Sequence, residues 1–289
     1  MPPVFRSLIY VPADKPRALA KARGLAADAI IVDLEDAVAP DSKEDAREAL
    51  REALTEPFSA PVIVRINGLA SEWATEDLLA ALAARPEGLL IPKVESAADL
   101  ERVADALDQA DALDRISLWA MIETPKALLN LADIASSSEK LPLKGVVLGL
   151  NDLAKETGVR PAQDRGAFLP WMMSVVAAAR AYGLVAIDGV LNDFGDDARL
   201  EAECEQARAL GFDGKSLIHP RQIDTANRIF APSAEEIAEA EAIVEAFARP
   251  EHAGKGAIGI EGRMVERLHL HVAESLLARA RAIADRDPA

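Results

Sequence analysis

Eight short apolar segments recur along the chain, and their spacing limits its fold more than any other feature. They begin 22 to 40 residues apart, which leaves room for one helix and two loops in each interval. Each is bounded by turn residues, as expected of buried β-strands. The segments are Ser7–Pro12, Ala29–Leu34, Val62–Ile66, Gly88–Lys93, Ile116–Ile122, Gly145–Leu150, Val185–Gly189 and Gly214–His219.

The intervals between these strands carry helix signals. Ser42 and Ser96 each stand three residues before an aspartate, the pair Thr124-Pro125 opens another interval, and Gly211 stands where a helix should end. Regular alternation of strands and helices predicts a parallel α/β sheet, and eight repeats favour a closed TIM (β/α)₈ barrel. A doubly wound open sheet is the alternative, but the glycine-rich turn that often follows its first strand is missing here.

The end of the chain loses this alternation. A capping box that starts at Ser233 opens a helix, the glycine-rich segment Gly254–Gly262 predicts a mobile hairpin or lid, and a final helix is expected from about Met264 to Ala284. Its G-x-G-x-x-G pattern follows no first β-strand, so a dinucleotide site is not expected. We predict a catalytic barrel over residues 1–230 and a helical extension over residues 231–289 that forms a lid and a subunit contact.

Composition limits the partners and the compartment. The chain has 289 residues, with 48 acidic and 32 basic side chains and a net charge of −16, which disfavours nucleic acid and anionic lipid as partners. Cys204 is the single cysteine, which excludes an internal disulfide and a cysteine-rich zinc site. Met1–Pro12 does not have the pattern of a signal peptide, and Phe168–Ile187 is too interrupted to span a membrane. We therefore expect a soluble, cytoplasmic protein.

Polar residues gather where the predicted strands end. In a parallel barrel the active site lies at the carboxyl ends of the strands, so these residues are the candidates for chemistry. They are Asp33, Glu35, Asp36, Arg65, Asn67, Lys93, Glu123, Asn151, Asp152, Asp188, Lys215 and His219.

Glu123 and Asp152 follow adjacent strands, the fifth and the sixth, so their carboxylates can meet over the barrel mouth. Mg²⁺ prefers oxygen ligands and commonly takes one or two protein carboxylates, with its other positions left for water and substrate. The alternative is that each carboxylate stabilises the start of the following helix. The pair on neighbouring strands favours the metal site.

Arg65 ends an apolar strand, and its planar guanidinium suits bidentate binding of a substrate carboxylate. A buried ion pair with Asp33 or Asp36 is the alternative, and both roles are compatible in one network. Lys93 and Lys215 could form a Schiff base with a ketone. Ion pairs with the aspartates or Glu35 are the preferred interpretation, because nearby carboxylates keep a lysine protonated. Structural roles are assigned to His219, His269 and His271.

Seven short motifs in this order and spacing resemble the citrate lyase beta-subunit-like branch of the HpcH/HpaI aldolase superfamily, which includes malyl-CoA and citramalyl-CoA lyases. The resemblance covers nearly the whole chain and implies a TIM barrel that forms a homotrimer or homohexamer. The motifs are Arg6-Ser-Leu-Ile-Tyr-Val-Pro12, Asp33-Leu-Glu-Asp-Ala-Val38, Arg65-Ile-Asn67, Pro92-Lys93, Ile122-Glu-Thr124, Gly149-x-x-Asp152-Leu and Gly211-Phe-Asp-Gly-Lys-Ser-Leu-Ile-His-Pro220.

The resemblance implies roles for individual residues. Glu123 and Asp152 would hold Mg²⁺, Arg65 would contact the 2-oxo or 2-hydroxy acid, and backbone amides near Leu150 and Asn151 would bind its carboxylate. Contacts to coenzyme A would fall near Tyr10 and Arg17, in a segment that gives this acidic chain a local basic patch.

A catalytic acid on the C-terminal lid is also implied, since relatives carry an aspartate in a Gly-x-Met-Ile/Val-Asp motif that reaches a neighbouring subunit. Here the motif reads Gly262-Arg-Met-Val-Glu266, so Glu266 stands in its place. With Arg65 and Glu266 as catalytic residues, we expect a Mg²⁺-dependent carbon–carbon lyase. It would cleave or form a 3-hydroxyacyl-CoA such as a malyl, citramalyl or citryl thioester, with acetyl-CoA and a small 2-oxo acid as products.

Three alternatives to the lyase stay open. The same site could hydrolyse a malyl-CoA-type thioester or act as an aldolase on oxo acids without CoA. A Schiff-base aldolase would use Lys93 or Lys215 and would need no metal. The chain could also be a non-catalytic subunit or scaffold, which the glutamate at position 266 makes conceivable.

Overall fold

The computed structural model describes residues 4–160, 162, 164–260 and 262–286. These residues form two compact units. The first is Phe5–Arg228, and the second contains Val4 and the described residues from Ile229 onward. Each unit is described separately below.

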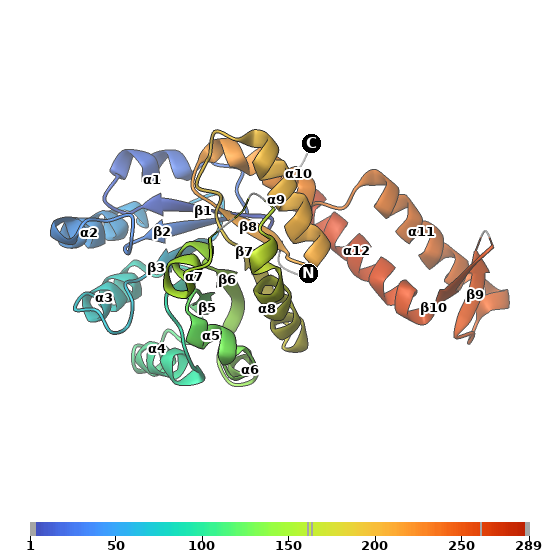
Figure 1. Ribbon diagram of the computed structural model, residues 1–289, viewed down its shortest axis with the longest axis horizontal. Helices are drawn as coiled ribbons and strands as arrows, with labels where there is room; N and C mark the ends of the chain where they lie inside the picture. Colours follow the sequence, from blue (N-terminus) through green and yellow to red (C-terminus); the bar gives the residue numbers. More distant parts are fainter. Residues whose placement is uncertain (1–3, 161, 163, 261, 287–289) are drawn as a thin grey trace. The chain divides into compact units, whose positions relative to one another are not determined.

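The first unit is built on eight parallel strands that pair in chain order and close into a barrel, with helices outside (Figure 1). This confirms the predicted TIM barrel, and each predicted strand overlaps an observed one. The sixth begins two residues earlier than predicted, and several end one or two residues earlier. The strands are β1 Ser7–Pro12, β2 Ala29–Asp33, β3 Val62–Arg65, β4 Gly88–Ile91, β5 Ser117–Ile122, β6 Leu143–Leu148, β7 Val185–Asp188 and β8 Gly214–Leu217.

Helices begin at most of the predicted signals. Ser96 forms a complete capping box with Asp99, Thr124 accepts a hydrogen bond from the backbone N–H of Ala127, and Gly211 ends its helix at a φ of 98°. Ser42 precedes a helix, but its side chain makes no capping hydrogen bond. The helices are α1 Pro16–Ala22, α2 Lys43–Ala53, α3 Ala74–Ala84, α4 Ala97–Gln109, α5 Pro125–Leu129, α6 Leu131–Ser136, α7 Leu150–Thr157, α8 Leu169–Ala181, α9 Asp197–Leu210 and α10 Ile223–Phe230.

Large apolar side chains fill the barrel interior below its mouth. Trp119 is almost fully buried and meets the ring of Phe5 edge to face, with centroids 5.0 Å apart. A Cβ atom at Gly145 would lie 2.5 Å from the Trp119 ring, so the absence of a side chain on β6 makes room for the indole. The closed interior leaves the strand ends as the open part of the barrel.

A buried charge cluster joins β7, β8 and α9. The ammonium of Lys215 is fully buried, and its Nζ donates to Asp188 Oδ2 at 2.7 Å and to Glu203 Oε2 at 3.0 Å. Arg165 Nη1 donates to Asp188 Oδ2 at 2.7 Å. The expectation that Lys215 pairs with Asp33, Glu35 or Asp36 is therefore wrong. Lys215 lies opposite Asp188 in the strand register, which brings the two side chains together. Arg165 pairs with Asp188, and Glu203 pairs with Lys215.

The second unit contains α11 Ala234–Ala248, β9 Ala257–Ile260, β10 Arg263–Glu266 and α12 Arg267–Arg286. The capping box at Ser233 is present, and β9 and β10 form the predicted hairpin. The last helix begins at Arg267 rather than near Met264, because residues 263–266 pair with β9 instead. Ala240, Ala273 and Leu277 form the small apolar contact between α11 and α12.

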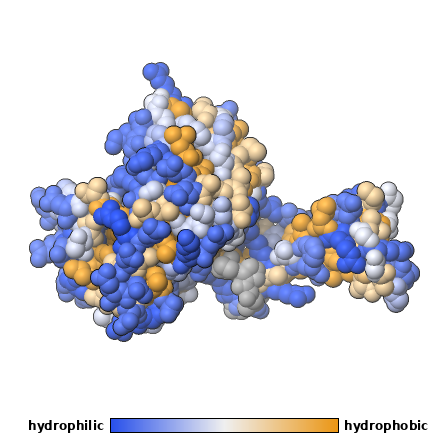
Figure 2. Space-filling model, turned by 90° about the horizontal axis from the view of Figure 1, so that it is seen from below, coloured by the Kyte–Doolittle hydropathy of each residue, from blue (hydrophilic) through white to orange (hydrophobic). Residues whose placement is uncertain are grey.

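The visible surface is mostly hydrophilic, with scattered apolar side chains (Figure 2). This agrees with the composition of the chain, in which 28% of the residues are charged. None of the helices among the described residues is both long and apolar enough to cross a membrane.

The buried cluster leads to a stability prediction. Burial by itself would raise the pKa of Asp188, but Lys215 and Arg165 lower it below its ordinary value. Replacing Asp188→Asn should lower the free energy of unfolding by about 3–5 kcal/mol at pH 7, because two buried cations lose a charged partner. A lowered carboxyl pKa stabilises the fold above the pKa of the unfolded chain, and this stabilisation is lost as pH falls through the lower folded value.

Urea unfolding of wild type and Asp188→Asn at several pH values measures both effects. The difference between the two proteins should be constant near neutrality and should shrink below about pH 4. Glu201→Gln on α9, the helix that carries Glu203, is the control, since Glu201 pairs with Arg228 at the exposed surface and should change little. A difference that persists undiminished at pH 2 would contradict the assigned role of the Asp188 charge.

Candidate active site

A cavity of about 290 Å³ opens at the carboxyl ends of the strands. It contains most of the residues that the sequence singled out for substrate and metal binding. The polar and aromatic residues that line it are Tyr10, Asp33, Asp36, Arg65, Glu123, Asn151, Asp152, Asn192 and Ser216. Leu150 and Gly149 line it as well.

Arg65 ends β3 and is held by a bidentate ion pair. Its Nε and Nη2 donate to the two carboxylate oxygens of Asp33 at 2.7 and 2.6 Å, across the register pair that joins β2 and β3. The Nη1 edge stands 3.1 Å from Glu35 and 3.6 Å from Asp36. The guanidinium lies over the ring of Tyr10, at 4.8 Å from its centroid. The expected ion pair is present, and Arg65 is also one of the residues that line the cavity.

Glu123 follows β5 and is almost fully buried. Its Oε1 accepts a hydrogen bond from the backbone N–H of Lys93 at 2.8 Å. Burial, together with the charges of Glu35 and Asp152, raises the pKa of Glu123 to about 8. Thr124, not Glu123, caps the following helix, so the helix-capping alternative does not describe Glu123.

Leu150, Asn151 and Asp152 form the first turn of α7, whose N-cap is Gly149. The first N–H groups of a helix have no partner inside it and carry a partial positive charge, so they suit an anion. Asn151 exchanges a reciprocal pair of side-chain hydrogen bonds with Asn192, at 3.2 and 2.9 Å. This pair joins the start of α7 to the loop after β7 at the cavity edge.

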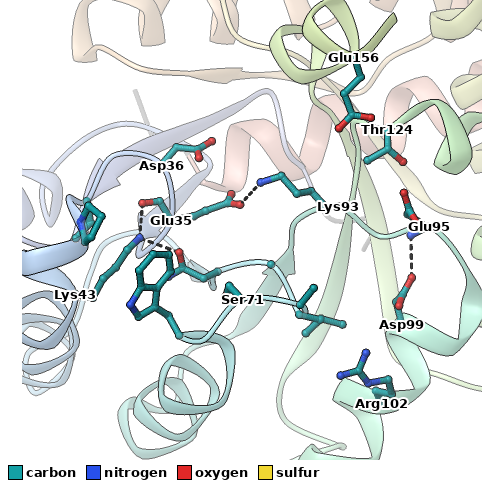
Figure 3. Close-up of a pocket in the computed structure, with 17 residues that line it drawn as sticks. Glu35, Asp36, Lys43, Ser71, Lys93, Glu95, Asp99, Arg102, Thr124 and Glu156 are labelled. Atoms are coloured by element: carbon teal, nitrogen blue, oxygen red, sulfur yellow. Dashed lines mark hydrogen bonds and ion pairs between the residues drawn. The ribbon is translucent and has the colours of Figure 1, made fainter.

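A second, larger cavity of about 750 Å³ adjoins the strand ends of β2, β3 and β4 (Figure 3). Lys93 and Glu35 approach each other there, with Lys93 Nζ 2.6 Å from Glu35 Oε1. Burial alone would lower the pKa of Lys93, but the bond to Glu35 raises it. The amine is therefore held protonated, which disfavours a Schiff base. The expected ion pair of Lys93 is confirmed.

Sequence reasoning missed Lys43, which supports this region from α2. It is 5% exposed, and its Nζ donates to the carbonyls of Leu34 and Glu35 and to Asn67 Oδ1 at 2.6, 2.8 and 2.8 Å. It also lies under the Trp73 ring. A lysine on the apolar face of an amphipathic helix was the available signal. Arg165 and Glu203 of the buried cluster were missed as well.

Arg17 and Glu266 are not among the residues that line this cavity. Arg17 is exposed on α1 and lines neither cavity described above. Glu266 belongs to the second unit, where its backbone N–H donates to His269 Nδ1 at 2.9 Å. His219 caps a short helix and stacks on Phe194, consistent with its structural assignment. The catalytic role of Glu266 and the coenzyme A role of Arg17 stay predictions.

The donor set around the cavity fits a hard divalent cation. Within the described residues, no group of three or more His, Cys, Asp or Glu side chains is placed to hold a metal ion. Glu123 and Asp152 line the cavity, repel each other, and have no ion-pair partner among those residues. Two carboxylates that leave most positions to water and substrate match the usual protein contribution to Mg²⁺. The site can therefore combine a cation with the Arg65 guanidinium around a small anionic molecule.

Comparison with known proteins agrees with this geometry. Residues 6–220 match the HpcH/HpaI aldolase/citrate lyase family. The chain is 49% identical to a (3S)-malyl-CoA thioesterase of Cereibacter sphaeroides, over 97% of this chain and 96% of that protein. It is 32% identical to the human mitochondrial citramalyl-CoA lyase, over 97% and 87%.

Solved structures give the same result. The Mycobacterium tuberculosis protein CitE, in complex with magnesium, acetoacetate and coenzyme A, has a TM-score of 0.80 and 32% identity. The match covers 96% of this chain and 98% of that one. Because the family match spans residues 6–220 and these relatives align over nearly the whole chain, the chain belongs to the HpcH/HpaI aldolase/citrate lyase family.

Proposed function

We propose that this protein is a magnesium-dependent thioesterase that hydrolyses the CoA thioester of a small 3-hydroxy dicarboxylic acid of the malyl type. The observation that carries the proposal is the single small cavity that Arg65, Glu123 and Asp152 line together. The 49% identity with a (3S)-malyl-CoA thioesterase over nearly all of both chains favours hydrolysis as the reaction.

Different residues of the cavity bind the substrate carboxylate and the metal ion. Arg65 and the N–H groups at Leu150 and Asn151 bind the substrate carboxylate, because both present hydrogen-bond donors with positive charge. Glu123 and Asp152 hold Mg²⁺. When bound, this ion supplies Lewis acidity that polarises oxygens of the acid. Tyr10 supports the guanidinium from below and remains a neutral phenol, since burial raises its pKa.

Coenzyme A is the other half of this substrate. We propose that its arm approaches the site near Tyr10, and that Arg17 on α1 contacts its phosphates. The CitE structure with bound magnesium and coenzyme A supports a site for both in this fold. A homotrimer or homohexamer stays a prediction, as does the cytoplasm as its compartment.

The expected carbon–carbon lyase is the second candidate, and the 32% identity with citramalyl-CoA lyase favours it. Cleavage of a 3-hydroxyacyl thioester leaves an enolate on the acetyl thioester, which an acid must protonate. Glu266 is the proposed acid for that reaction. Hydrolysis forms no such enolate, so the two candidates differ in their products and in their need for this residue.

Product analysis separates these candidates. Purified protein stripped with EDTA should convert (3S)-malyl-CoA to malate and free CoA only after Mg²⁺ is added, as followed by mass spectrometry. Acetyl-CoA with glyoxylate, or acetyl-CoA with pyruvate from citramalyl-CoA, would identify the lyase instead. Turnover of free hydroxy-oxo acids alone would identify an aldolase, and no turnover at all would favour a non-catalytic subunit.

The metal assignment leads to a second prediction. Glu123→Gln should weaken Mg²⁺ binding, measured by isothermal titration calorimetry, by at least about tenfold and lower kcat/KM by about 10²-fold or more, because a neutral amide replaces a charged ligand. Glu156→Gln is the matched control, since Glu156 is exposed on the same helix as Asp152. Unchanged Mg²⁺ affinity in Glu123→Gln would remove Glu123 from the metal site.

The raised pKa of Glu123 leads to a prediction about the pH dependence of metal binding. The pKa of Glu123 is about 8, so at lower pH this buried carboxyl group is mainly protonated in the metal-free protein. Metal binding requires the deprotonated carboxylate. Mg²⁺ affinity should therefore rise as pH increases from about 6 to 8 and level off above. Calorimetry in buffers of different ionisation enthalpy should detect close to one proton released per ion at pH 7. Binding without proton release would contradict this.

A further inference from the structure

Lys93 adopts a backbone conformation that is unusual for a lysine. It lies two residues after β4 with a φ of 53°, in the left-handed region where glycine is favoured. A non-glycine residue persists there only when its surroundings hold it, and such residues gather at functional sites. Lys93 lines the larger cavity beside the candidate active site (Figure 3).

This conformation lets one residue contact two buried carboxyl groups. The backbone N–H of Lys93 donates to Glu123 Oε1 at 2.8 Å, and its Nζ donates to Glu35 Oε1 at 2.6 Å. Glu35 and Glu123 are 5% and 1% exposed and come from the ends of different strands. Like charges in such positions repel each other, so a donor between them fixes both.

Each carboxyl group has a second constraint on its far side. A Cβ atom at Gly149 would lie 2.6 Å from Glu123 Oε2, so Glu123 is confined between the Lys93 N–H and the start of α7. Glu35 Oε2 is buried, accepts no hydrogen bond, and stands 3.1 Å from Arg65 Nη1. The contacts of Lys93 therefore extend to the proposed metal ligand on one side and to the arginine on the other.

We propose that Lys93 is a positioning residue. Its backbone orients Glu123 at the metal end of the substrate site, and its ammonium group orients Arg65 through Glu35 at the other end. Its left-handed backbone sets the direction of Glu123 toward the metal. Its ammonium sets Glu35, which in turn restricts Arg65, the residue assigned to the substrate carboxylate. The proposal rests on the proposed function, in which Glu123 holds Mg²⁺.

Two substitutions separate the two effects. Lys93→Gly removes the ammonium and keeps access to the left-handed region, whereas Lys93→Val removes the ammonium and strongly disfavours that region. Calorimetric titration with Mg²⁺ alone should give Lys93→Gly a dissociation constant within about threefold of wild type and Lys93→Val one about tenfold or more weaker. Both should raise KM for (3S)-malyl-CoA by about tenfold, and Lys93→Arg should restore it to within about threefold.

Arg85 supplies a matched control, because it has a φ of 56° at the end of α3 and lines neither cavity. Arg85→Gly and Arg85→Val should bind Mg²⁺ and substrate as wild type does, although their stabilities differ. Equal Mg²⁺ affinity of Lys93→Gly and Lys93→Val would overturn the backbone role. An unchanged KM in both would overturn the ammonium role. Wild-type protein that binds no Mg²⁺ would instead refute the proposed function, and the Arg85 variants would fail equally.

Discussion

The ion pair between Arg65 and Asp33 is the interaction on which the site depends. A guanidinium at a strand end inside the mouth is tolerable only when a carboxylate satisfies it, and the parallel register of β2 and β3 places Asp33 directly beside it. The bidentate contact occupies Nε and Nη2, while Nη1 lies near Glu35 and the side chain lines the cavity. One pair of side chains therefore both stabilises the fold and orients a group that can bind substrate.

The fold could be predicted because each signal in it is local. Runs of apolar residues give the strands, capping residues such as Ser96 and Thr124 give the helix starts, and the spacing gives the closed barrel. The same logic predicted that Arg65, Glu123 and Asp152 face the mouth, since strand ends converge there, but it wrongly included the buried Asp188 and Lys215. Glu123 and Asp152 line one cavity for this reason.

What could not be predicted depends on distant partners. Lys215 lies inside β8 and Lys93 follows β4. Lys215 is buried with Asp188 and Glu203, whereas Lys93 reaches Glu35. Sequence spacing does not tell on which side of a strand a long side chain lies when both sides carry acids. Lys43 shows a related limit, because its ammonium is buried only through the way the loop before α2 folds back to offer the carbonyls of Leu34 and Glu35.

Glycine 145 and Trp119 have a consequence for how this barrel can change over evolution. The indole occupies the space that a side chain on β6 would need, so the two positions share one fixed volume. A larger residue at Gly145 is acceptable only after Trp119 has become smaller, and the reverse order leaves a void. The interior of the barrel can therefore be remodelled here by paired exchanges, while the residues at its mouth keep their positions.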